Sequence, residues 1–211
     1  MIIKTQSDLL EIRRIMERST KFLSLSSIGS VMAGIFALVG AYLAHRYIYR
    51  SQELIYGYLE EGIFSSRLMP LWYIAFAVFS SALVVNLWLS YKKSKESNQK
   101  LWSTPAKRLF INFSIPFISG AFFVLILFKN GYFTLLSSSA LIFYGLSLLN
   151  AGNFTFSDIR WLGISMTICG LLSLLFPGKG LYFWAVGFGI LHILYGLIMY
   201  VKYDRKSKNC Q

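Results

Sequence analysis

The sequence predicts an all-α polytopic membrane protein with six transmembrane helices. Its 211 residues are 55% hydrophobic and 14% charged, whereas a soluble domain is about 45 to 50% apolar and about 25% charged. Six apolar runs contain no Asp, Glu, Lys or Arg, and each is close to the roughly 20 residues that cross about 30 Å of hydrocarbon. These runs are residues 22–44, 68–90, 109–128, 132–150, 161–176 and 181–201.

The runs divide the chain into three parts: residues 1–21, the transmembrane domain 22–201 and a basic tail 202–211. In the first part, Leu9, Ile12 and Met16 are spaced so that they share one face of a helix. We expect an amphipathic helix that lies at the membrane interface on the cytoplasmic side. A docking surface for a soluble partner is the alternative interpretation.

The first predicted span carries small residues at intervals of four. Gly29, Ala33 and Ala37 form this row, and small residues at that spacing allow a second helix to approach closely. We expect the row to pack within the monomer, with a homo-oligomer or another membrane partner as the alternative. The segment 45–67 that follows is too short for a separate domain and is expected to contact the interface.

The connecting segments on the two sides of the membrane differ in their number of lysine and arginine residues. By these boundaries 16 of them fall on the side of the termini and 5 on the other. Since basic residues favour the cytoplasmic side, both termini are predicted to be cytoplasmic, in what is expected to be a bacterial inner membrane. The net charge of +12 therefore indicates anionic lipid head groups rather than nucleic acid as partners. A basic docking site is the alternative for the clusters Lys92, Lys93, Lys95, Lys100, Lys107, Arg108 and Lys202, Arg205, Lys206, Lys208.

The third predicted span contains a proline within its helix. Pro116 has no N–H to donate, so the carbonyl of Asn112 loses its usual partner. The sequence therefore predicts a local kink.

The last four spans resemble two copies of one hairpin. Gly120 and Gly145 flank the tip sequence Lys-Asn-Gly, and Gly170 and Gly196 flank the tip sequence Gly-Lys-Gly. The glycines of the two copies are 25 and 26 residues apart. Two hairpins in this register suggest an internal duplication, although apolar helices can share such spacing by chance.

The spacing of glycines and of the Pro-Gly pair in residues 109–200 is similar to that of the HdeD-like acid-resistance membrane proteins. The similarity lies in Arg160-Trp-Leu-Gly163, Phe176-Pro-Gly178, Gly187-Phe-Gly189 and Tyr195-Gly196. It implies a small bacterial six-helix protein of repeated hairpins, with a possible role in envelope stress and no catalytic residues to carry over. The start of the chain and the 23-residue first loop depart from that pattern.

One ionisable side chain lies within the predicted spans. His192 is near the middle of the sixth, and Tyr195 shares its helix face. We expect a neutral histidine hydrogen-bonded to a neighbouring helix, with a proton relay or a ligand site as alternatives. No metal or cofactor is expected, because His45, the second histidine, lies too far from His192 in depth to share a haem iron.

Other polar residues within the spans are interpreted as hydrogen bonds between helices. Asn86, Asn112 and Ser138 are the main examples, and the serine run 137–139 is the best candidate for the lining of a polar path. At the start of the fifth span, Asp158 and Arg160 are expected to form a local ion pair.

The sequence lacks the motifs of serine hydrolases, zinc proteases and nucleotide-binding loops. The leading hypothesis is a non-enzymatic integral membrane protein that acts through helix packing, lipid contact or a partner. The alternative is a small transporter or channel with a polar path near His192.

Overall fold

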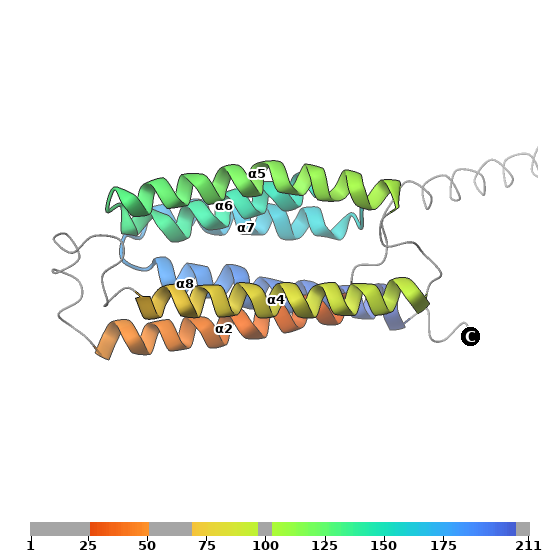
Figure 1. The fold of residues 1–211 in the computed structure, drawn as a ribbon, viewed down its shortest axis with the longest axis horizontal. Coiled ribbons are helices and arrows are strands. Elements are labelled where there is room, and N and C mark those ends of the chain that lie inside the picture. Colours follow the sequence, from red (N-terminus) through yellow and green to blue (C-terminus); the bar gives the residue numbers. More distant parts are fainter. Residues whose placement is uncertain (1–25, 51–68, 97–102, 206–211) are drawn as a thin grey trace, which may run out of the picture.

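The computed structural model describes residues 26–50, 69–96 and 103–205, and these residues are almost entirely helical (Figure 1). The predicted interfacial helix in 1–21, most of the loop 45–67 and the end of the basic tail lie outside the described residues.

The described residues form six helical rods that run along the molecule. The first five are α2 (Ser27–Arg50), α4 (Met69–Glu96), α5 (Thr104–Lys129), α6 (Phe133–Ala151) and α7 (Asp158–Leu174). The sixth is built from α8 (Gly180–Trp184), the π-helical turns η1 (Ala185–Leu191), α9 (His192–Met199) and the π-helical turns η2 (Tyr200–Asp204). These four pieces follow one another directly, and we call them together the last helix.

Five of the rods are long and apolar enough to cross a membrane: α2, α4, α5, α6 and the last helix. The helix α7 has 17 residues and is about 26 Å long, slightly shorter than the roughly 30 Å of a hydrocarbon core. It ends before Pro177, and the chain then turns at Gly178, whose φ of 83° favours glycine. The structure thus supports an all-helical protein with membrane-length helices, and one of the six predicted spans is short.

The rods form two layers of three (Figure 1). One layer holds α5, α6 and α7, and the other holds α4, α2 and the last helix. Contacts of α6 and α7 with the last helix join the layers. A buried apolar cluster, which includes Leu141, Met166 and Met199, fills that junction.

Within the first layer, α6 and α7 approach so closely that their backbones touch. A Cβ atom added to Gly145 would lie 2.7 Å from the carbonyl oxygen of Gly163, and one added to Gly163 would lie 2.8 Å from that of Gly145. A Cβ atom on Gly170 would lie 2.9 Å from the carbonyl oxygen of Ser138. No larger side chain fits between these helices without moving them apart.

The second layer is held together in the same way around α2. A Cβ on Gly196 would lie 2.7 Å from the carbonyl oxygen of Ser27, so the last helix contacts α2 directly. Gly29 faces Asn86 of α4. Ala37 is buried and Ala33 is half-buried. Gly29 and Ala37 of the predicted row are thus buried within the monomer.

The two predicted hairpin copies agree only in part. Their tips both turn at a glycine with positive φ, Gly131 and Gly178. However, Gly120 contacts Phe143 of its own hairpin, whereas Gly170 contacts α6 of the preceding one. The duplication stays a prediction, because the marker glycines do not make equivalent contacts.

The chain compensates for Pro116 with a side chain. The helix α5 continues through Pro116, and the carbonyl of Asn112, which the proline leaves without a donor, accepts a hydrogen bond of 2.8 Å from Nδ2 of Asn150 in α6. The helix is thus uninterrupted, and its free carbonyl is satisfied from the neighbouring helix. The kink itself stays a prediction.

Replacement of the contact glycines should destabilise the bundle. We expect Gly145→Leu and Gly196→Leu to lower the thermal unfolding temperature in detergent, because overpacking costs about 1 to 3 kcal/mol. The control is Ala121→Leu, at an exposed position of α5, which should unfold like the wild type. Wild-type unfolding temperatures for both glycine variants would contradict the close packing.

Candidate functional site

His192 is held by two hydrogen bonds where the π-helical turns of the last helix end. Its Nδ1 lies 3.1 Å from the carbonyl oxygen of Gly187, and its Nε2 lies 3.0 Å from the hydroxyl of Tyr144 in α6. A carbonyl only accepts, so Nδ1 carries a proton, and in a neutral imidazole Nε2 then accepts from the tyrosine. Both ring nitrogens of His192 therefore have a hydrogen-bond partner.

The π-helical turns place the histidine at this point. Such wide turns are uncommon and often occur at functional sites. Here Gly187 and Gly189 are both buried. A side chain on Gly187 would collide with Leu141, while Gly189 gives α2 room to approach. The glycines thus allow the last helix to pack closely against α2 in its own layer and against α6 in the other layer. His192 points to α6.

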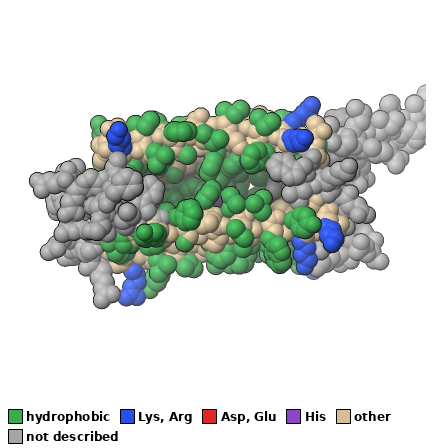
Figure 2. Space-filling view, in the orientation of Figure 1, with side chains coloured by type: hydrophobic (Ala, Val, Ile, Leu, Met, Phe, Trp, Pro, Cys, Tyr) green, Lys and Arg blue, Asp and Glu red, His purple; other side chains and the backbone are tan. Residues whose placement is uncertain are grey.

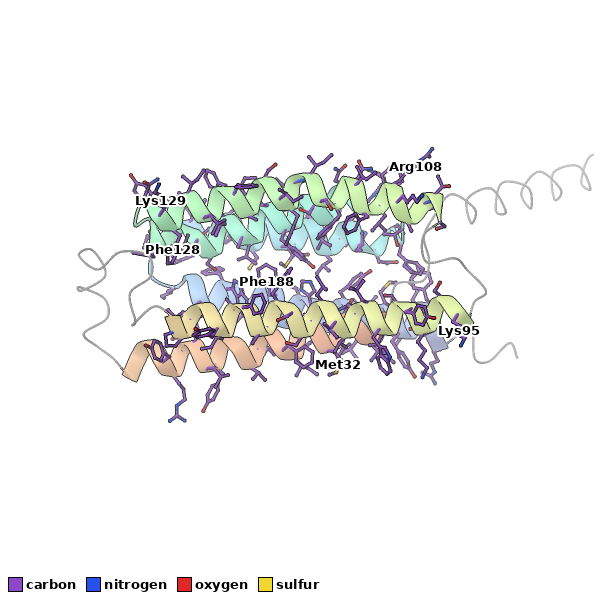
Figure 3. The ribbon with its side chains drawn as sticks, in the orientation of Figure 1. Met32, Lys95, Arg108, Phe128, Lys129 and Phe188 are labelled. Atoms are coloured by element: carbon purple, nitrogen blue, oxygen red, sulfur yellow. The ribbon has the colours of Figure 1, made fainter. Side chains whose placement is uncertain are left out.

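A row of aromatic rings crosses the bundle through this pair. Phe79 of α4 stacks on Phe117 of α5, with ring centroids 6.3 Å apart. The row continues through Phe113 to Tyr144, whose ring lies 5.0 Å from that of Phe188 and 5.5 Å from that of His192. Figure 3 shows Phe188 between the two layers. The layers are thus connected by ring contacts and not by glycine packing alone.

A hollow accompanies this row on one face of the molecule. Figure 2 shows it between the two layers, on the face where α4 and α5 lie in front, with hydrophobic side chains around it. Phe79 and Phe117 contact each other between these two helices. We call this space the hollow.

The predicted residue Tyr195 does not join His192. It lies in the buried apolar cluster with Leu141 and Met166, and the partner of the histidine is Tyr144. The positions of the two residues within their spans could have predicted this pairing. Tyr144 lies 12 residues into the predicted span that begins at residue 132. His192 lies 11 residues into the predicted span that begins at residue 181. Both spans start on the same side, so these side chains reach similar depths.

Asn86 and Asn112 behave as structural residues. Nδ2 of Asn86 donates to the carbonyl oxygens of Gly29 at 3.1 Å and of Ala82 at 2.9 Å, which ties α4 to α2. The side chain of Asn112 donates to Arg108 in its own helix. Asn150, which the sequence analysis did not single out, makes the bond between α6 and α5.

The serine run also joins helices. Ser138, which is fully buried, donates to Ser173 of α7 at 2.9 Å. Ser137 donates to the carbonyl oxygen of Gly180 at 2.6 Å. These hydroxyls bind protein atoms on α7 and α8, so they do not form the lining of a polar path.

Charged groups gather at the end of the bundle where α4 ends and α5 begins, which we call the basic end. Asp204 accepts from Lys93 of α4 at 2.8 Å and also from Ser27 of α2. Asp158 of α7 accepts from Lys202 at 2.7 Å and from Tyr203 at 2.7 Å. The end of the last helix is thus connected to both layers.

The expected local pair of Asp158 with Arg160 is wrong. Arg160 instead donates to Asn153, because the helix start directs Asp158 toward the last helix. Asp158 lies before the predicted span 161–176. Partial burial raises the pKa of its carboxyl, but hydrogen bonds from Lys202 and Tyr203 outweigh burial, and the pKa falls below its ordinary value.

Within the described parts of the chain, no three His, Cys, Asp or Glu side chains are grouped so that they could hold a metal ion. His45 lies at the opposite end from Asp204, where Nε2 is 3.1 Å from the hydroxyl of Tyr182. The two histidines thus contact different tyrosines at different depths. Searches of protein-family models, of curated proteins and of solved structures gave no match to this chain.

Loss of the Tyr144 hydroxyl should reveal its coupling to His192. Tyr144→Phe leaves Nε2 buried without a donor, which costs about 1 to 3 kcal/mol. The same change in a His192→Phe background should cost less, because no acceptor is then left unpaired. Denaturant unfolding of the four proteins measures this difference, with the exposed Tyr200→Phe as control. Additive effects would contradict the hydrogen bond.

The Asp158 cluster predicts a pH-dependent stability. A carboxylate whose pKa is lowered by folding stabilises the protein above its ordinary pKa, and this contribution is lost as the pH falls through the folded pKa. Asp158→Asn should therefore unfold at a lower temperature than the wild type at neutral pH, and the two should converge in acid. Arg160→Gln is the control, and a difference that does not change with pH would contradict the cluster.

Proposed function

We propose that this chain is a non-enzymatic integral membrane protein of six transmembrane helices that acts through contact with lipids or with a membrane partner. The observation that carries the proposal is the division between its surface and its interior. Large apolar side chains cover the outer faces of the rods, with Phe76 at 72%, Trp161 at 70% and Tyr73 at 69% exposure. Hydrocarbon is the solvent that such a surface fits.

The interior supports this proposal over a transport function. Every buried side-chain N or O atom in the described chain has a hydrogen-bond partner. Three of these bonds join different helices: Tyr144 with His192, Ser138 with Ser173, and Asn86 with the backbone of α2. A conducting path needs polar atoms that can exchange protein partners for water or substrate, and these bonds consume them.

Packing supports the sixth crossing despite the short length of α7. This helix lies against α6 along the contacts from Gly145 to Gly163 and from Ser138 to Gly170. It also connects the basic end to the opposite end of the bundle (Figure 1). Local thinning of the bilayer and small tilts accommodate a few ångströms of mismatch, so we infer that α7 crosses together with α6.

Several further features of the proposal come from the sequence. The distribution of Lys and Arg favours cytoplasmic termini in a bacterial inner membrane, with anionic lipids at the basic segments. Besides lipids, the proposed partner is a second copy of this chain or another membrane protein. The similarity to HdeD-like proteins favours a role in envelope stress.

A small transporter or channel is the second candidate. One observation favours it: His192 and Tyr144 meet at π-helical turns inside the bundle, and protonation of the histidine would turn Nε2 from an acceptor into a donor to the tyrosine oxygen. A proton flux through proteoliposomes that disappears with His192→Phe would favour this candidate. The leading proposal expects equal flux with and without the protein.

Reporter fusions test the topology. Fusions at residues 155 and 211 should report the cytoplasmic side, and fusions at residues 57 and 179 the opposite side, because 16 of the 21 Lys and Arg residues fall in the segments on the side of the termini. A cytoplasmic signal at residue 57 would overturn the orientation. A cytoplasmic signal at residue 179 together with a signal from the opposite side at residue 211 would overturn the crossing by α7.

A further inference from the structure

The hollow lies at the middle of the predicted spans. Phe79 is the central residue of the second span, and Phe117 lies within two residues of the centre of the third. Tyr144 and Phe188 lie within three residues of the centres of their spans. Three residues of helix are about 5 Å long, and half of a hydrocarbon core is about 15 Å thick. The rings around the hollow are therefore about 10 Å or more from either head-group region.

The helices α4 and α5 stand on either side of this space. Each packs mainly on one neighbour, α4 on α2 and α5 on α6. In the most apolar part of α4 and of α5, 6% of the residues are buried, against 39% in α2 and 33% in α6. Phe79 stacks on Phe117 between the two helices, and Phe79 is still 52% exposed. The hollow is thus open sideways, in the direction of the surrounding hydrocarbon.

The floor of the hollow is aromatic. Phe113 contacts Tyr144 edge to face at 5.9 Å, and Tyr144 lies 5.0 Å from Phe188, centroid to centroid. These three rings are half-buried although they lie inside the bundle, so part of each ring surface is free for a further contact. The hydroxyl of Tyr144 is bonded to His192. The floor thus offers carbon to an occupant, and such a surface penalises a charged or strongly polar group.

Depth and lining together indicate a hydrocarbon chain. The predicted spans contain no charged residue, and Figure 2 shows lysine and arginine only toward the two ends of this face. A further helix needs about 8 to 10 Å between axes, so it would have to separate Phe79 from Phe117, whose ring centroids are 6.3 Å apart. An empty hollow would leave the free ring surfaces without dispersion contacts. A bilayer supplies the ends of phospholipid chains at this depth.

We propose that the end of a phospholipid acyl chain occupies the hollow. The chain enters sideways between α4 and α5 and packs on the rings of Phe79, Phe117 and Phe188. The inference rests on the proposed membrane function and adds a defined contact to it, a lipid chain inside the bundle as well as around it. The head group stays outside, so the hollow accepts the chain irrespective of the head group. The chain completes the junction that the ring contacts between the layers leave partly open.

The contact is tested on the unaltered full chain with photoreactive lipids in nanodiscs. Phosphatidylcholine and phosphatidylglycerol each carry a diazirine at the methyl end of one acyl chain, and mass spectrometry locates the labelled residues. We expect both lipids to label Phe188 inside the bundle and Phe76 on its outer face, and to spare Leu141 of the buried cluster. A diazirine next to the chain carbonyl should not label Phe188. Label at Phe76 without label at Phe188 would overturn the site.

The lining is tested with one variant and a matched control. Phe79→Asn places an amide beside the hollow, whereas Phe76→Asn places it three residues away, where the native side chain is 72% exposed. The first variant should reduce the label at Phe188 at least about fivefold, because an amide without a partner disfavours a hydrocarbon neighbour. The second should leave the label unchanged. Equal labelling of Phe188 in the two variants would contradict the proposed lining.

Other occupants would give different results in the same nanodiscs. One molecule per protein of solanesol, an isoprenoid alcohol, should leave the label at Phe188 unchanged, and loss of the label would overturn the phospholipid chain as occupant. Loss of the label in discs that hold two copies of the chain would show that a second copy covers the hollow, and would also overturn it. Failure of the proposed function would differ, because Phe76 would then carry no label and the reporter fusions would show no crossing.

Discussion

Inside a bilayer the lipid chains are as apolar as leucine, so burial of apolar surface does not hold helices together. Close van der Waals packing and hydrogen bonds must do so. This constraint explains where the bundle has glycine. Gly145 and Gly163 bring α6 and α7 into backbone contact, and Gly196 brings the last helix against Ser27 of α2. Each of the two layers is built on such a contact.

The junction between the layers follows another physical rule. Aromatic rings from α4, α5, α6 and the last helix meet there, with centroids 5.0 to 6.3 Å apart. Ring pairs favour offset or edge-to-face geometry and tolerate small changes in spacing better than touching backbones do. The bond between Tyr144 and His192 fixes one point of this junction, and the basic end fixes another. The bundle therefore combines two tight layers with a more adaptable space between them.

Local features of the fold could be predicted from the sequence, whereas pairings between distant segments could not. Apolar runs and turn glycines predict the rods, because a helix satisfies its own backbone. The partner of His192 depends on which antiparallel helices are neighbours, and helix periodicity alone pointed to Tyr195 instead of Tyr144. Likewise, the sequence shows that Pro116 leaves the carbonyl of Asn112 without a donor, but not that Asn150, which lies 38 residues from Asn112 in sequence, supplies one.

The basic residues show why a count of charges is an incomplete guide to lipid binding. Lys93 and Lys202 belong to clusters that the sequence assigned to lipid head groups, yet they bind Asp204 and Asp158 and hold the ends of four helices together. The charges of a lysine and its bonded carboxylate nearly cancel, so the pair attracts a distant phosphate only weakly. Two aspartates thus separate the lysines that stabilise the bundle from the exposed basic residues of the same segments, such as Lys92 and Lys95. A count of charges along the sequence treats these two groups as one.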